Sequence, residues 1–221
     1  MTSILKVDQL QDSGGNAILT SDGAGSITTS SALNTAITNA GFITSGGRST
    51  LLTTTTISSA VSYFDMTDIM TNAYNNYLLV FYGMKVSTDG TDIRVTFFTG
   101  SGTGGHIASS GNYKYAYKQI KTDGTESLGA STTDPFYRPN NNGIGNGGNE
   151  TANGQLQFFD MRNTTKRLLY GEVHSIDTGN NFVSSRSVCG SDFGDNAVTG
   201  LRFQVASGNI TAGTFKLYGQ D

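Results

Sequence analysis

The 221-residue chain contains one cysteine, two prolines, two histidines and no tryptophan. The single cysteine, Cys189, excludes an internal disulfide and a CxxC metal site, and we expect it to be a small buried residue. His106 and His174 cannot be matched by sequence to a nucleophile and an orienting partner, and no G-x-S-x-G or HExxH motif is present. The sequence therefore favours a protein that is not an enzyme, and it predicts no cofactor and no catalytic residue.

Charge and long apolar runs are also scarce. Charged residues make up 14% of the chain, the net charge is -3, and no block of one sign occurs, so neither nucleic acid nor an anionic membrane is predicted as a partner. No apolar run approaches the roughly 18 residues of a membrane span, and the first residues lack the features of a signal peptide. We expect a soluble protein made in a cytoplasm, without membrane insertion.

Three sequence patterns are consistent with ligand binding, but each is explained more simply by turn formation. The run GSGTGG at 100–105 lacks the Lys-Ser/Thr and the helix of a phosphate loop, which favours a glycine-rich surface turn. Asp89 with Asp92, and Asp192 with Asp195, supply too few oxygen ligands for Ca²⁺ unless carbonyls or waters complete the shell. Turn formation is the favoured role of these aspartates, so no metal site is predicted, although calcium stays an alternative.

Glycine is abundant instead, and together with Thr, Ser and Asn it separates short β-branched and aromatic runs. Such runs predict strands, and the absence of a long helical pattern predicts an all-β fold. We expect an antiparallel, jelly-roll-like β-sandwich with one helical turn near 69–75 and an Asp89-Gly90 hairpin turn. The predicted strands cover 50–57, 61–66, 77–86, 92–99, 113–121, 154–160, 166–174, 182–188, 198–206 and 213–219.

The last of these strands places Phe215 and Leu217 on one face and Lys216 on the other. We expect this strand to pair within the sandwich and to close it, so that its removal would unfold the domain.

Residues 1–47 differ from the rest, because Phe42 is their only aromatic residue. Apolar segments at 4–10 and 17–19 predict two short strands, and the spacing of apolar residues predicts a helix over 31–40. This segment is too poor in large apolar residues to form a core alone. We predict that partners order it, as an attachment and oligomerisation segment preceding a head domain at 48–221; a flexible leader is the alternative. The predicted contact residues are Ile4, Leu5, Val7 and Leu10.

Alternation within 113–121 places three tyrosines on one face and two lysines on the other. The tyrosine face is either a surface for sugars or proteins or the core side of a strand, and the lysines on the opposite face favour the core. The segment 122–153 is long and rich in Gly and Asn, which is typical of a functional or interfacial loop. The candidate surface or intersubunit residues are Tyr113, Tyr115, Tyr117, Phe136, Tyr137 and Arg138, of which Tyr137 and Arg138 are expected to be exposed or between subunits with this loop.

The opening SILKVDQLQDSGGNAIL resembles that of structural proteins of bacteriophages, especially marine phages and cyanophages. The segments 74–102, 155–175 and 201–220 are similar to the same group, whereas 122–153 shows the weakest similarity. The resemblance implies a virion protein, commonly a homotrimer. Such a protein attaches to other tail or capsid proteins by its N-terminus and displays a β-domain outward, as a short tail fibre or a capsid fibre.

The resemblance carries no catalytic residue, and it leaves several roles open. The head could bind a glycan or protein of the host cell surface, gaining avidity from several copies. It could instead be a capsid decoration protein that stabilises the shell and recognises nothing. A glycan-cleaving tail protein is a third alternative, which would need paired carboxylates in a groove.

Overall fold

The computed structural model describes residues 9–11, 13–21, 27–29, 49–141, 143–163, 167–191, 193–194 and 196–220. Contacts divide the chain into two units, Met1–Arg48 and Ser49–Asp221, and we call the second unit the head. In the first unit, β1 (Gln9–Gln11), β2 (Ala17–Ser21) and β3 (Ile27–Thr29) form a three-stranded antiparallel sheet. The helix predicted at 31–40 lies outside the described residues.

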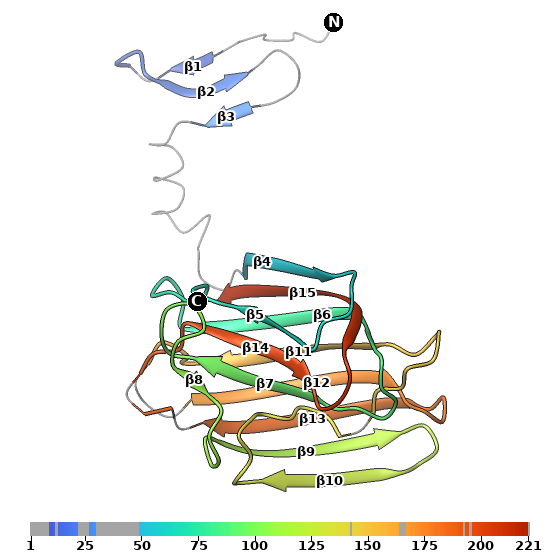
Figure 1. The fold of residues 1–221 in the computed structure, drawn as a ribbon. Coiled ribbons are helices and arrows are strands. Elements are labelled where there is room, and N and C mark those ends of the chain that lie inside the picture. The colour runs from blue at the N-terminus through green and yellow to red at the C-terminus, as the bar shows by residue number, and fades with distance from the viewer. Residues whose placement is uncertain are drawn as a thin grey trace, which may run out of the picture. The chain divides into compact units, whose positions relative to one another are not determined.

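In the described part of the head, twelve strands form two antiparallel sheets, which confirms the predicted all-β sandwich (Figure 1). The large sheet has eight strands in the order β10-β9-β13-β12-β11-β6-β15-β4, and the small sheet has four in the order β5-β14-β7-β8. Their bounds are β4 (Thr50–Ile57), β5 (Tyr63–Met66), β6 (Asn76–Val86), β7 (Ile93–Phe98), β8 (His106–Ile107), β9 (Tyr113–Lys121), β10 (Glu126–Ser131), β11 (Ala152–Phe159), β12 (Arg167–Ile176), β13 (Phe182–Ser191), β14 (Gly200–Val205) and β15 (Ile210–Gln220).

The core lies between the two sheets and is dominated by aromatic rings. Phe81 and Phe215 from the large sheet meet Phe64 and Phe203 from the small sheet, with ring centroids 4.6–5.9 Å apart. Phe215 is fully buried on β15, which pairs with β6 on one side and β4 on the other. The final strand is therefore an interior strand of the large sheet, as expected.

The small sheet has too few strands to cover the large one, and the segment 132–150 covers much of the rest. Tyr137 exchanges two backbone hydrogen bonds with Val95 of β7, each 2.9 Å long, which extends the small sheet. Beneath this segment the large sheet carries buried polar side chains. Ser185 Oγ donates to the Pro139 carbonyl at 2.9 Å, and Gln119 Oε1 accepts from the Asn141 amide at 3.2 Å. The loop predicted at 122–153 thus contains β10 and a structural cover.

Two local predictions are wrong. Residues 69–75 form turns and no helix. Asp89-Gly90 does not close a hairpin, because β6 belongs to the large sheet and β7 to the small one. The turn instead carries the chain between the layers, with Gly90 in the left-handed region at a φ of 67°.

Candidate functional site

The three tyrosines of β9 face the core. Tyr113 is fully buried, and Tyr115 and Tyr117 are at most 8% exposed. Tyr113 Oη donates to the Ile107 carbonyl at 2.8 Å and accepts from the Phe97 amide at 3.1 Å. This burial overturns a surface role for these rings and confirms the alternative, the core side of a strand.

Tyr137 is also fully buried, so the expectation of an exposed or intersubunit Tyr137 is wrong. Its hydroxyl lies 2.5 Å from Ser187 Oγ on β13, and its ring packs at 6.3 Å from Tyr115. Gly171 of β12 makes this docking possible, since a Cβ there would collide with the Tyr137 hydroxyl. The physical reason for the burial is that Tyr137 fills the space which the small sheet leaves open.

Phe136 and Arg138 are half-buried and engaged within the chain. The Arg94 guanidinium stacks on the Phe136 ring at 4.2 Å, and Arg138 Nε donates to Tyr115 Oη at 3.1 Å. Arg94 and Arg138 approach the buried Asp92 at 3.4 and 4.0 Å. Burial raises the pKa of Asp92 above its usual value, although both arginines oppose the rise.

These contacts commit Asp92 to arginine rather than to calcium. Asp89 Oδ1 accepts from the Asn146 amide at 3.2 Å, a contact with a distant segment rather than within its own turn. Asp192 and Asp195 lie outside the described residues. Within the described ranges, no three His, Cys, Asp or Glu side chains are grouped so as to hold a metal ion.

The predicted attachment residues Ile4, Leu5 and Val7 lie outside the described residues, whereas Leu10 lies on β1 and is half exposed. Their role as contacts stays a prediction.

The feature that the sequence did not reveal is the outer face of the large sheet. In the described part of the chain, ten large apolar side chains are exposed, and eight of them lie on this face. The eight are Leu51, Tyr82, Ile120, Leu128, Phe159, Leu168, Phe182 and Val188. Clustering of this kind is typical of an interaction surface, because apolar residues without such a role are usually scattered singly.

Strand register arranges the apolar residues in a row across all eight strands. The row of successive cross-strand partners consists of Ala130, Ala116, Val188, Tyr170, Gln157, Leu78, Tyr218 and Leu51. Gln157 is the only polar member of this row. We call the apolar members of this row, with the flanking Leu128, Phe159 and Leu168, the apolar belt. A depression of about 300 Å³ lies in it beside Leu128, Tyr170 and Val188.

A row of charged residues borders the belt. Lys118, Arg186 and Glu172 are cross-strand neighbours on the same face. Lys118 pairs with Glu126 at 3.0 Å, and Arg186 Nε donates to Glu172 Oε1 at 3.1 Å. The charges of this row are therefore already matched within the chain.

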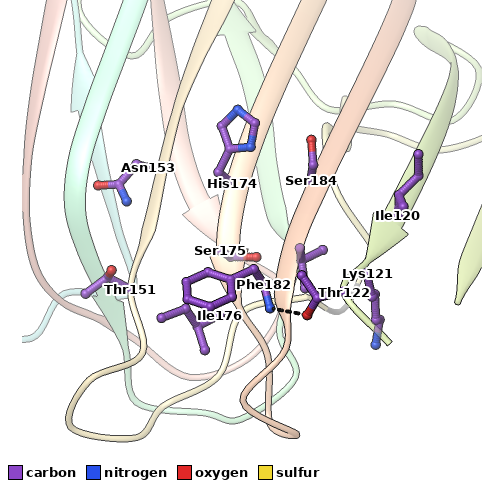
Figure 2. A pocket seen from close by; sticks show the side chains of 11 residues that line it. Ile120, Lys121, Thr122, Thr151, Asn153, His174, Ser175, Ile176, Phe182 and Ser184 are labelled. Carbon is purple, nitrogen blue, oxygen red and sulfur yellow. Dashed lines mark hydrogen bonds between the residues drawn. The ribbon is translucent and has the colours of Figure 1, made fainter. Parts of the chain in front are cut away.

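Beyond the charged row, the outer face is hollowed, and we call this cavity of about 540 Å³ the hollow. Figure 2 shows Phe182 beside Ile176, with His174 and Asn153 farther along the strands. The side chains that it presents outward combine apolar and polar groups; they are Ile120, Thr122, Thr151, Asn153, His174, Ile176, Phe182 and Ser184.

Two polar side chains of the hollow, Asn153 and His174, differ in how they are held. Asn153 Oδ1 accepts from the Gly83 amide at 2.8 Å, where β6 bulges and Gly83 takes a φ of 61°. This bond fixes the orientation of the Asn153 carboxamide and leaves its Nδ2 group as the donor that can reach a ligand. His174 Nε2 lies 3.6 Å from Glu172 Oε1, and the His174 side chain is more than half exposed. The arrangement suits reversible binding through hydrogen bonds and apolar contact.

Among the described residues, no helix is long and apolar enough to cross a lipid bilayer. No protein-family model, curated protein or solved structure matches the chain.

Proposed function

We propose that the chain is a non-enzymatic structural protein of a phage particle, a short homotrimeric tail fibre or capsid fibre. Residues 1–47 attach it to other virion proteins, and the head is displayed toward the host. The phage assignment rests on the sequence resemblance. The observation that carries an assembling role is the concentration of exposed apolar side chains on one face of the head.

The apolar belt is the contact between copies of the chain. Eight strands spaced by about 4.8 Å make it roughly 38 Å wide, and with the charged row it covers about 20 Å along the strands. In a ring of three this area of roughly 750 Å² is divided between two neighbours, so each contact takes roughly 375 Å² from each partner, about half of the ~800 Å² of a standard interface. Burying the charged row in such a contact costs desolvation free energy, and this cost is reduced because its ion pairs are formed within each copy.

Both ends of the belt are apolar, which suits a closed ring of three copies. Leu128 and Val188 lie toward β10, and Leu51 and Tyr218 lie toward β4. Around a threefold axis, the β10 side of one head contacts the β4 side of the next. The hollow, at the other end of the strands, remains open in each copy, and three open sites give avidity.

Light scattering of the full chain tests this assembly. We expect the mass of three copies at micromolar concentration and a monomer for the double substitution Leu128→Lys, Val188→Lys. Thr103→Lys introduces one of the two added positive charges at an exposed position on the turn before β8 and should leave the mass unchanged. A monomeric wild-type chain would overturn the proposal.

Attachment and adhesion need separate tests. Deleting residues 1–30 should prevent incorporation into particles, and retained incorporation would contradict the attachment role. Binding of the purified chain to host cells distinguishes a fibre from a capsid decoration protein. Binding to no susceptible cell would favour decoration.

A further inference from the structure

We propose that the hollow is a binding site for a neutral saccharide. This inference rests on the proposed adhesive function and names its ligand class. The volume of about 540 Å³ lies within the range of about 300–1,000 Å³ that is typical of small-ligand sites. The hollow is open to solvent on a sheet face, as a site must be if it binds part of a longer chain on a cell surface.

The apolar part of the lining suits the C–H face of a pyranose ring. The Phe182 side chain is 67% exposed, although an aromatic ring of this size is usually buried in a folded domain. It stands next to Ile176 in the cross-strand register, and Ile120 lies on the neighbouring strand β9. Together they offer a platform against which a sugar ring packs while its hydroxyls point outward.

The polar part of the lining suits hydroxyl groups. Asn153 presents its Nδ2 donor, and His174 presents a ring that can donate or accept. Ser184 lies between Ile120 and His174 in the same cross-strand row and adds a hydroxyl. Several donors and acceptors around an apolar platform match a ligand that carries hydroxyls on a hydrocarbon ring.

The charges around the hollow favour a neutral ligand. Lys121 Nζ is held by Asp177 at 2.8 Å, and Glu172 is shared by Arg186 and His174. Each charged group at the rim therefore has a partner of opposite sign within the chain. An anionic ligand would have to break one of these pairs, whereas a neutral saccharide leaves them intact.

Ligand-observed saturation-transfer NMR on the full chain tests the site. The probes are glucose, galactose, mannose, N-acetylglucosamine and their β-linked disaccharides at millimolar concentration, with sialic acid as the anionic comparison. We expect saturation of the ring C–H protons of at least one neutral sugar. Phe182→Ala should weaken that affinity by about tenfold, because it removes the stacking platform. Asn153→Ala should weaken it as well.

The matched control is Tyr63→Ala, which truncates an exposed aromatic residue on the small sheet, outside both the belt and the hollow. It should leave saccharide binding unchanged. The inference would be overturned if no probe is saturated, or if sialic acid alone is saturated. It would also be overturned if a neutral sugar is saturated to the same extent in wild type and in Phe182→Ala. Phe182→Ala lies outside the belt and should keep the mass of the wild type. The two proposals can therefore fail separately. A chain that binds sugar but is not a trimer contradicts the assembly alone, and a trimer that binds no sugar contradicts the site alone.

Discussion

Replacing Phe215 by alanine tests whether the four-ring cluster holds the two sheets together. Phe215 is fully buried and contacts Phe64, Phe81 and Phe203, at centroid distances of 4.6, 5.9 and 5.0 Å. Removing a buried phenylalanine side chain costs about 3–5 kcal/mol, from the lost burial and the cavity that remains. Single domains are stable by only about 5–15 kcal/mol, so we expect Phe215→Ala to lose a large share of the stability of the head.

The assay is equilibrium unfolding in urea, followed by tyrosine fluorescence and far-ultraviolet circular dichroism. The loss of free energy corresponds to a fall in melting temperature of roughly 6–20 °C for a domain of this size. Lys216→Gln is the matched control, since the next side chain points to the outer face and should change the stability by no more than about 0.5 kcal/mol. A loss below about 1 kcal/mol for Phe215→Ala would refute the role assigned to the cluster.

Three further changes test other parts of the head. Deleting residues 215–221 removes more than half of the strand between β6 and β4 and should leave an unfolded, insoluble chain; a soluble, folded product would contradict this. Tyr137→Phe and Ser187→Ala each lose the buried hydroxyl contact and should cost about 1 kcal/mol in urea unfolding, with the double variant costing less than the sum of the two. Burial alone would raise the pKa of Asp177, but hydrogen bonds from Lys121 and from backbone amides of the turn after β12 lower it to about 2 from an ordinary value of 3.8. The contribution of this carboxylate to the free energy of unfolding is therefore fully present above about pH 4 and is lost as the pH falls toward 2. Asp177→Asn should make the free energy of unfolding fall less steeply with pH in that window. The same pH dependence in wild type and variant would argue against this role.

Most strands of the head were predictable because each carries its own signal. The run YKYAYKQIK of β9 alternates so regularly that burial of Tyr113, Tyr115 and Tyr117 follows from Lys114 and Lys118 on the other face. The sheet to which each strand belongs was not predictable. β6 and β7 are joined by a short connection with an Asp-Gly turn, yet they lie in different layers, and such long-range partners leave no mark on a short stretch of sequence.

The segment 132–150 was misread for a related reason. Its composition is that of an exposed loop, but Tyr137 and Ile144 are fully buried. The evidence that this segment covers the large sheet lies in the strands beneath it, where Ser185 and Ser187 occupy inward positions of β13. Buried hydroxyls need partners, and a segment of irregular backbone supplies carbonyls that a regular sheet uses internally.

The outer face left a signal in the sequence that alternation alone obscures. In β12, Leu168 and Leu169 are adjacent and so point to opposite faces, and in β13 the same is true of Val188 and Cys189. A strand with apolar residues on both faces is expected where both faces are covered, as in sheets between two layers. The small sheet and its cover account for one face of β12 and β13 only. We propose that another copy of the chain supplies the layer that covers the apolar residues on the other face, and the mass of the Leu128→Lys, Val188→Lys variant decides whether it does.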